Sequence, residues 1–347
     1  MKFSTCFLTI VAIAICQSSC QVLRKNPQAA GEVRVGFYNV ENLFDTEDDP
    51  AVNDDEFTPG GKLQWTEERY KKKLEQLAKV VDGMAYPALF GMAEVENAKV
   101  LEDFCEKTSL SKHRYQFVHF DSPDERGIDV ALLYQKELFT VIGADTIAIH
   151  FPKEVAGEDP NPATRDVLVV KGVLGKKDTL NVLVVHAPSR YGGEEQTQPE
   201  RIYVAQQIKQ KTVEIFRQNP NANILIMGDF NDEPDNKSIA ETLAAKPIPL
   251  GTPMANTLFN CFLELDAIGE GTYNYRGNWN MLDQIIISTH LLAAKNSLHF
   301  SKASIFRQEW MMYNDDRNGP RPNRTYGGDR YFGGFSDHLP VMVVLEW

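Results

Sequence analysis

Short apolar segments that end in polar or glycine-rich residues recur along the whole chain. They cover residues 33–40, 88–95, 129–134, 167–174, 180–187, 224–230, 282–288 and 339–345. Segments of this length that are rich in Val, Ile and Leu are typical of strands buried on both faces. The chain must therefore cover its sheets from both sides, with other sheets or with helices.

Helical patterns lie between some of these segments. After Thr66, a favourable N-cap residue, Leu74, Leu77 and Val81 recur at helical spacing as far as Gly83. Similar patterns run over residues 97–110 and 199–218. Because strands outnumber helices, the sequence favours an α/β (α+β) fold in which sheets pack together with helices outside.

The first residues follow a different pattern. Lys2 precedes the apolar run 7–15, and two serines stand directly before Cys20. This order is typical of an export signal of the lipoprotein type, in which Cys20 would carry a lipid anchor. We therefore expect an export signal at 1–20, a linker at 21–32 and one domain at 33–347. The protein would be exported, either as a membrane-anchored lipoprotein or as a periplasmic or secreted protein.

The composition limits the partners of the chain. The formal net charge of −12 argues against broad adhesion to polyphosphate, which usually requires a basic surface. Cys105 and Cys261 would be the cysteines of the mature domain, which is no disulfide framework, and we interpret both as core residues. Nothing in the sequence indicates an obligate protein partner, and we expect a monomer.

Polar side chains stand at or near the ends of the apolar segments. They are Asn39, Glu94, His186, Asp229, Asn231, Asp283, Asp337 and His338. Each of these alone has a plain structural explanation, because Gly-Asp after a strand is usually a turn and Ser-Asp-His before a strand is usually a capped loop. Together they are harder to dismiss, since carboxylates and imidazoles are costly to bury unless they meet one another, a metal or a ligand.

Four of these segments carry recognisable motifs. They are GDFND at 228–232, SDHLPV at 336–341, HAPS at 186–189 and TRDVLVVKG at 164–172. Over residues 33–347 the ordered series resembles the endonuclease/exonuclease/phosphatase superfamily, and the last two motifs resemble its deoxyribonuclease branch. The resemblance implies a four-layer sandwich of two packed mixed β-sheets flanked by helices. It also implies a metal-dependent phosphoesterase.

The resemblance assigns roles to the polar residues. Glu94 would hold Mg²⁺ or Mn²⁺, with Asn39 and Asp337 nearby, which suits the preference of these ions for oxygen ligands. Asp229 and Asn231 would orient or deprotonate the attacking water. Asp283 would hold His338. His186 would lie opposite as a second acid or base, or as a donor to the phosphate, with support from Asp129, and which histidine donates the proton stays open.

Further residues are candidates for binding the substrate or a second ion. Arg165, Arg276, Tyr326 and Arg330 could grip phosphates or stack on bases, although surface ion pairs and a solvated glycine-rich loop are the plainer interpretations. Asp45, Asp48, Asp49, Asp54 and Asp55 make residues 44–65 acidic. Ca²⁺ is a candidate ion there, but the spacing of an EF-hand is missing, which favours a solvated loop.

We therefore predict an exported phosphodiesterase of nuclease type that acts on DNA or RNA. An alternative is a phosphatase or phosphodiesterase for inositol phosphates or phospholipid head groups. A third hypothesis, from another class, is an inactive binding module on the same fold.

Overall fold

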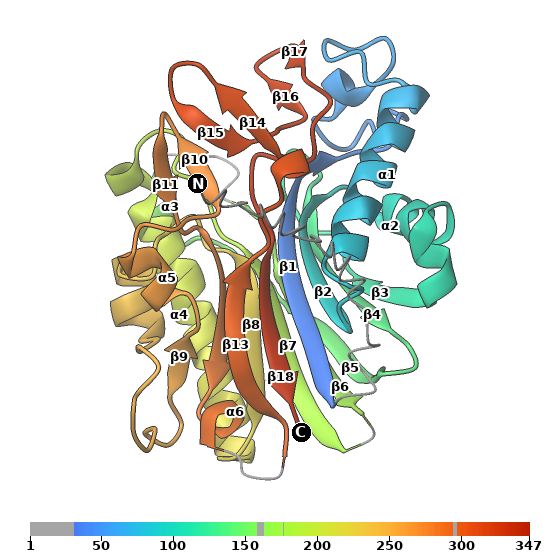
Figure 1. Ribbon diagram of the computed structural model, residues 1–347. Coiled ribbons are helices and arrows are strands. Elements are labelled where there is room, and N and C mark those ends of the chain that lie inside the picture. The colour runs from blue at the N-terminus through green and yellow to red at the C-terminus, as the bar shows by residue number, and fades with distance from the viewer. Residues whose placement is uncertain (1–30, 158–162, 176, 294–296) are drawn as a thin grey trace, which may run out of the picture.

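Two six-stranded mixed sheets form the centre of the computed structural model (Figure 1). The structure describes residues 31–157, 163–175, 177–293 and 297–347. The predicted export signal at 1–20 and most of the predicted linker lie outside the described residues.

The first sheet contains both ends of the described chain. Its strands follow the order β13 (His299–Ile305), β18 (Val341–Glu346), β1 (Glu32–Leu43), β2 (Leu89–Val95), β4 (Asp129–Gln135) and β3 (Tyr115–His119). Strands β1 and β2 are parallel, and the other neighbours are antiparallel. The second sheet has the order β5 (Phe139–Ile147), β6 (Val167–Leu174), β7 (Asp178–His186), β8 (Asn223–Asp229), β12 (Asp283–Ser288) and β9 (Leu258–Asn260), with β7 and β8 parallel.

Short ribbons and helices complete the fold. The ribbons pair β10 (Tyr273–Tyr275) with β11 (Asn278–Asn280), β14 (Met312–Asp315) with β15 (Gly319–Pro322), and β16 (Tyr326–Gly327) with β17 (Arg330–Tyr331). The helices are α1 (Glu67–Gly83), α2 (Ala98–Glu106), α3 (Lys153–Ala156), α4 (Glu194–Gln218), α5 (Leu263–Ala267) and α6 (His290–Ala293). Short helical turns are η2 (Asp55–Phe57), η3 (Ser109–His113), η4 (Ser238–Leu243) and η5 (Glu309–Met311).

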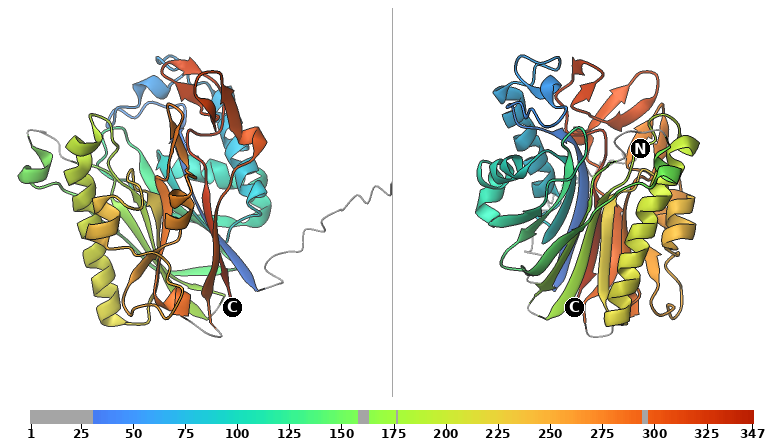
Figure 2. Two further views of the ribbon diagram at one scale, coloured as in Figure 1. Left: turned by 60° about the vertical axis from the view of Figure 1, so that its left-hand side comes forward. Right: turned by 180° about the vertical axis from the view of Figure 1, so that it is seen from behind.

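Three apolar cores hold the layers together. The central core joins the two sheets through residues such as Phe37 and Met227. Helices α1 and α2 pack on the outer face of the first sheet, with Leu74 and Phe104 among the buried residues, and α4 packs on the outer face of the second. Figure 2 shows the sheets between these helices. The predicted four-layer sandwich is therefore confirmed, and its doubly covered strands explain the continuous apolar runs of the sequence.

The structure departs from the sequence-based expectations at the sheet edges. Strands β3, β5 and β13 were not expected, because their side chains are mostly half-buried or exposed and give no long apolar run. Helix α4 begins at Glu194, before the expected start at Pro199. In the described part of the chain, no helix is both long enough and apolar enough to cross a membrane.

Candidate active site

The polar residues that the sequence singled out meet at one end of both sheets. Glu94, His186 and Asp229 lie at the carboxyl ends of β2, β7 and β8, while Asp283 begins β12 and His338 precedes β18. Because β12 and β18 run opposite to their neighbours, their first residues reach the same edge as the last residues of β7 and β8. In sheet register, Asp229 is the direct partner of both His186 and Asp283.

An irregular backbone turns several of these side chains toward one point. The pairing of β2 with β4 shifts register between Ala93 and Val95, and Glu94 has a φ of 63° at this bulge. Asn231 also adopts a left-handed backbone, with a φ of 49°. Such conformations are unfavourable for residues other than glycine, and they tend to cluster at functional sites. Bulges next to active sites commonly re-aim a side chain, as this one does for Glu94.

Asn39 links the carboxylates that come from the two sheets. Its Nδ2 donates to Asp229 Oδ2 at 3.0 Å and to Glu94 Oε1 at 3.3 Å. The amide oxygen of Asn39 accepts from the backbone N–H of Glu41. In this arrangement the Asn39 amide faces Glu94 with its nitrogen, so Asn39 orients the expected metal ligand.

His338 and Asp283 form the expected pair. His338 Nδ1 lies 2.7 Å from Asp283 Oδ2, and His338 Nε2 faces Asp229 Oδ2 at 3.8 Å. Burial disfavours the imidazolium, but the carboxylates of Asp283 and Asp229 outweigh burial and raise the pKa of His338 well above its ordinary value. This direction favours the protonated form of His338.

His186 approaches the carboxylate of Asp229 from the other side, but its pKa is shifted in the opposite direction to that of His338. Its Nε2 lies 3.7 Å from Asp229 Oδ2 and 3.8 Å from Glu94 Oε1. Burial, together with the charges of Arg165 and Arg126, holds the pKa of His186 well below its ordinary value. The lowered pKa favours the neutral form of His186, whereas the raised pKa of His338 favours its protonated form.

The expected support of His186 by Asp129 was wrong. Asp129 Oδ2 lies 3.1 Å from His119 Nε2, and its other oxygen accepts from the backbone and hydroxyl of Ser122. His186 Nδ1 is buried and has no hydrogen-bond partner among the described residues. Because β4 begins at Asp129, this carboxylate pins the loop before that strand instead of reaching the end of β7.

A buried charge network that the sequence did not reveal lies behind Asp337. Arg324 donates to Asp337 in a short contact and lies 3.7 Å from Glu41. Lys73 of α1 donates to the hydroxyl of Thr325 and to the carbonyl of Phe335, each at 2.6 Å. Burial and the charge of Asp337 raise the pKa of Glu41 to about 7, and burial lowers the pKa of Lys73 to about 8.

This network sets the charge of Asp337. Burial alone would raise the pKa of Asp337, but His338 and Arg324 lower it below its ordinary value, so this side chain is an anion. Lys73 and Arg324 carried no motif of their own. In the sequence, Lys73 stood out only as a cation on the apolar face of the predicted helix, and Arg324 only as one arginine of an arginine-rich loop.

A cleft of about 960 Å³ opens over these residues. Its floor contains Glu94, Asp229, Asp337 and His338, and its walls include Arg126, Arg165, Arg190, Tyr191, Tyr273 and Tyr275. Of the four residues expected to bind substrate, Arg165 is the one that lines this cleft. Its guanidinium donates to Asp124 at 2.9 Å and to the carbonyl of Ala187 at 2.8 Å.

The other three expected substrate residues lie elsewhere. Tyr326 donates its hydroxyl to the carbonyl of Leu63 and packs near Trp65, so it holds the C-terminal loop in place. Arg330 is exposed and lies over the ring of Phe332. Arg276 stacks on Tyr275 beside the cleft without lining it. The arginine-rich loop is thus largely structural, because its cations are used by neighbouring rings and carboxylates.

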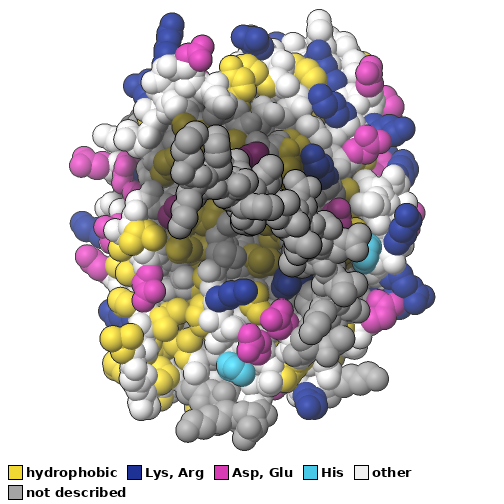
Figure 3. All heavy atoms as spheres, viewed as in Figure 1, with side chains coloured by type: hydrophobic (Ala, Val, Ile, Leu, Met, Phe, Trp, Pro, Cys, Tyr) yellow, Lys and Arg dark blue, Asp and Glu magenta, His cyan; other side chains and the backbone are white. Residues whose placement is uncertain are grey.

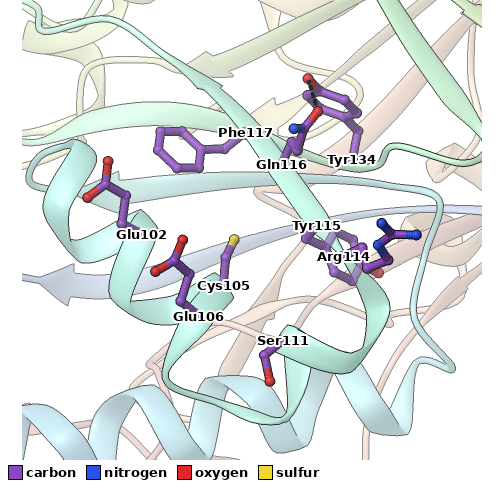
Figure 4. Close-up of a pocket in the computed structure, with 9 residues that line it drawn as sticks. All are labelled: Glu102, Cys105, Glu106, Ser111, Arg114, Tyr115, Gln116, Phe117 and Tyr134. Carbon is purple, nitrogen blue, oxygen red and sulfur yellow. Dashed lines mark hydrogen bonds between the residues drawn. The ribbon is translucent and has the colours of Figure 1, made fainter.

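A second cavity of about 570 Å³ lies outside this site (Figure 4). Glu102, Cys105 and Glu106 of α2 line one side, and Gln116 and Tyr134 from β3 and β4 line another. The Tyr134 hydroxyl donates to Gln116 at 3.1 Å. None of the residues expected to act in catalysis lines this cavity.

The donor set at the end of the sheets suits a hard divalent cation. Four carboxylates, those of Glu94, Asp229, Asp283 and Asp337, gather beside two cations, His338 and Arg324. Burial and repulsion from Asp283 raise the pKa of Asp229, and the charge of His338 opposes this shift. Oxygen donors in this number are what Mg²⁺ and Mn²⁺ prefer, and no cysteine takes part.

A divalent-metal phosphoesterase is the class of enzyme that this fold and this site define. A family model described as the endonuclease/exonuclease/phosphatase family matches residues 34–347. The chain belongs to this family, whose members are metal-dependent phosphodiesterases and phosphatases. The resemblance drawn from the sequence motifs is confirmed, and an inactive binding module does not fit this assignment.

Solved structures with the same fold come from functionally different relatives. A humanized D. rerio TDP2 with 14 mutations is 13% identical, with a TM-score of 0.55 over 91% of this chain and 100% of that chain. The catalytic domain of human Nocturnin is 16% identical, with a TM-score of 0.54 over 91% and 94%. A mannosyl-6-phosphatase from Bacteroides thetaiotaomicron is 17% identical, with a TM-score of 0.54 over 91% and 100%. No curated protein matches the chain.

Proposed function

We propose that the protein is an exported phosphodiesterase that uses Mg²⁺ or Mn²⁺ to hydrolyse nucleic acid. The observation that carries the proposal is the position of Asp229 between two buried histidines whose pKa values shift in opposite directions. His338 Nε2 lies 3.8 Å from Asp229 Oδ2 on one side, and His186 Nε2 lies 3.7 Å from it on the other. Phosphoester hydrolysis needs this combination of a base for water and positive charge for the phosphate oxygens.

The residues divide the work as follows. Asp229, whose Oδ1 accepts from the backbone of Asn231 at 2.9 Å, would orient the water and take its proton. His338, fixed by Asp283, would donate a proton or a hydrogen bond to the phosphoryl group. His186, whose lowered pKa favours the neutral form, would donate an Nε2–H hydrogen bond to a phosphate oxygen. A divalent cation held by Glu94 and Asp337 would supply positive charge for the oxygens on which charge develops.

The walls of the cleft support a nucleic acid as substrate. Tyr191 is 93% exposed and Tyr275 is 53% exposed, although both line the cleft. Exposed aromatic rings beside a phosphate site are suited to stacking on bases. Arg165 lines the cleft and is 8% exposed, and its guanidinium is held by Asp124 and by the carbonyl of Ala187, which gives the phosphate site a fixed positive charge.

A small phosphate ester is the second candidate substrate. The net charge is −12, and on the face shown in Figure 3 the cationic and anionic side chains are interspersed instead of forming a basic band. A long polyanion would gain little attraction from such a surface. The structural likeness to the mannosyl-6-phosphatase points the same way, so sugar phosphates belong with inositol phosphates and phospholipid head groups among the alternatives.

A panel of substrates separates these candidates. The purified protein with Mg²⁺ or Mn²⁺ is offered plasmid DNA, RNA, bis-nitrophenyl phosphate, mannose 6-phosphate, inositol phosphates and sphingomyelin. Nicking of plasmid, with loss of activity in Tyr191→Ala on DNA but not on bis-nitrophenyl phosphate, supports a nuclease. Turnover of a small phosphate ester alone would overturn nucleic acid as the substrate and leave the phosphoesterase site intact.

The export part of the proposal rests on the N-terminal pattern. Cys20 would carry the lipid, so labelled palmitate should enter the parent protein but not Cys20→Ser. The parent should fractionate with membranes and the variant with the soluble exported fraction. Palmitate incorporation in both proteins would contradict the assignment of Cys20.

A further inference from the structure

Arg126 lines the catalytic cleft, and the proposed division of work gives it no role. Two other arginines line the same cleft, and both are bound within the protein. Arg165 donates to Asp124, and Arg190 donates to the carbonyl of Asn231. The Arg126 side chain is 47% exposed, and its two terminal nitrogens make no hydrogen bond with any described residue. Arg126 is therefore the cleft arginine whose guanidinium is open to a ligand.

A tight turn carries Arg126. Asp124 Oδ1 accepts from the backbone N–H of Arg126 at 3.0 Å, and the N–H of Gly127 donates to the carbonyl of Asp124 at 3.0 Å. Gly127 has a φ of 63°, and a Cβ at this position would lie 2.8 Å from Val52, so the turn requires glycine here. The backbone of Arg126 is thus fixed, while the end of its side chain stays free.

Residues 44–65 pack against this turn. The backbone N–H of Asn53 donates to the carbonyl of Glu125 at 2.8 Å. The sequence favoured a solvated acidic loop over these residues, which was wrong for Asp45 and Asp54, because both are buried. The segment therefore supports the turn that carries the free arginine.

One buried carboxylate holds Arg126 beside Arg165. Asp124 is 8% exposed, and its Oδ2 lies 2.9 Å from Arg165 Nη1, while its Oδ1 lies 3.8 Å from Arg126 Nε. Arg165 donates with its other terminal nitrogen to the carbonyl of Ala187, the residue after His186. Arg165 therefore lies between Arg126 and the catalytic histidine. Two guanidiniums against one carboxylate leave a net positive charge on this wall of the cleft.

We propose that Arg126 binds a second phosphate group of the substrate, beside the phosphate that is hydrolysed. This inference rests on the proposed function, in which the reacting phosphate lies over Asp229 and between the two histidines. A free guanidinium can bind a phosphate through two parallel hydrogen bonds. The cleft of about 960 Å³ has room for a ligand much larger than one phosphate group.

The substrate class that follows is an ester with at least two neighbouring phosphates. Consecutive nucleotides of a nucleic acid have this chemistry, and so does an inositol polyphosphate. A single free arginine suits one additional phosphate near the reacting one. It does not demand a basic band along the surface, and this agrees with the formal net charge of −12.

Inhibition by matched ligands with one and two phosphates tests the inference. The reporter reaction is hydrolysis of bis-nitrophenyl phosphate with Mg²⁺ or Mn²⁺. One inhibitor pair is thymidine 5′-phosphate and thymidine 3′,5′-bisphosphate, and the other is inositol monophosphate and inositol bisphosphate. In at least one pair, the parent should bind the bisphosphate about tenfold more tightly than the monophosphate, since a charged hydrogen-bond partner is gained. The pair with the larger ratio identifies the source of the second phosphate.

Variants assign the preference to Arg126. Arg126→Gln should reduce the affinity ratio to about one, and Arg126→Lys should keep part of it, because the charge remains but the paired hydrogen bonds do not. Arg114→Gln is the matched control and should keep the parent ratio, since Arg114 is exposed and pairs with Glu137. In a second measurement that needs no turnover, the bisphosphate should raise the melting temperature of the parent more than that of Arg126→Gln.

The other outcomes overturn the inference. The same ratio in Arg126→Gln and the parent would place the second phosphate elsewhere. Equal losses of affinity for the monophosphate and the bisphosphate would assign Arg126 to the reacting phosphate. A parent that hydrolyses the reporter but binds both ligands of each pair equally would retain the proposed function and lose the second phosphate. If no phosphate ester is hydrolysed, the proposed function fails, and equal melting shifts in Arg126→Gln and the parent would then exclude the second phosphate independently.

Discussion

At the scale of single residues, Asp229 organises the site. It is 1% exposed, and its carboxylate contacts the Asn39 amide and the backbone of Asn231 while it faces both histidines. An acid this buried would be protonated at neutral pH if it stood alone. A protonated His338 and any bound cation favour the ionised form of Asp229, so the proposed base and the positive charges around it depend on one another.

Replacing His338 removes the proposed proton donor. We expect His338→Ala to lower kcat by about 10²- to 10⁴-fold, the usual contribution of a positioned acid or base. His299→Ala is the matched control, because His299 lies on β13 and bonds the carbonyl of Ser297, away from the cleft. Steady-state kinetics on bis-nitrophenyl phosphate measure both. Equal activity in His338→Ala and the parent would remove His338 from the mechanism.

The profile of activity against pH should be bell-shaped, with both limbs displaced toward higher pH. Activity needs ionised Asp229, whose pKa is raised, and protonated His338, whose pKa is also raised. The rate therefore increases as the pH rises through the pKa of Asp229 and decreases as it rises through that of His338. Asp283→Asn should move the descending limb to lower pH, because it removes the carboxylate that contributes most to the shift. A descending limb that stays in place would contradict the His338 assignment.

The pair of His338 and Asp283 also makes the stability of the fold depend on pH. The pKa of His338 is higher in the folded chain than the ordinary value of about 6.5, so its contribution to stability is complete below that value. The contribution is lost as the pH rises through the raised pKa. Chemical unfolding of the parent and of Asp283→Asn, compared between acidic and alkaline pH, measures this contribution as a difference that is larger in the parent.

At the scale of secondary-structure elements, α1 and α2 each have a capping side chain at the N-terminus, and the capping hydrogen bond is longer in α1 than in α2. Thr66 accepts from the N–H of Arg69 at 3.4 Å, whereas Asn97 accepts from Val100 at 3.0 Å and also bonds Asp45. We expect Asn97→Ala to cost about 1–2 kcal/mol and Thr66→Ala about 0.5 kcal/mol, measured by thermal unfolding. Exposed Lys71→Ala on α1 should stay near the parent, and a larger loss in Thr66→Ala would contradict this ranking.

Strands buried on both faces could be predicted from the sequence, whereas strands at the edges of the sheets could not. Each of the eight apolar runs corresponds to a strand, from β1 to β18, because burial on two faces demands continuous apolar residues. Edge strand β5 is largely exposed, and its buried and exposed residues do not alternate regularly. Its sequence therefore gives no strand pattern, and its pairing with β6 determines its conformation. The same limit applies to the site: strand-end residues were found, but Lys73 and Arg324 meet Asp337 only through tertiary packing.

At the scale of the whole molecule, the two sheets come into close contact where a glycine of one sheet faces a methionine of the other. A Cβ on Gly91 of β2 would lie 2.5 Å from Met227 Sδ of β8 and 3.0 Å from a ring carbon of Phe37. This close approach brings the end of β2, with Glu94, toward the end of β8, with Asp229. The spacing of the catalytic groups therefore depends on a contact inside the core.

We expect Gly91→Ala to destabilise the fold by about 1–3 kcal/mol through overpacking and Met227→Ala by about 2–5 kcal/mol through the cavity it leaves. The double variant should lose less than the sum, because the new methyl group enters the space left by the methionine. Urea unfolding of all four proteins gives the coupling. Strict additivity would show that the two sheets do not meet at this pair.

The pairing of β1 with β18 affects how the protein reaches its native state. Glu32 pairs with Glu346, and Phe37 pairs with Val341, so the central strands of the first sheet join segments from opposite ends of the described chain. Such high contact order slows folding, because a large loop must close before the strands gain from pairing. During synthesis on a ribosome, β1 can pair with β18 only after the residues between them have emerged. The sheet that carries Asn39 and Glu94 is therefore completed only when β18 is available.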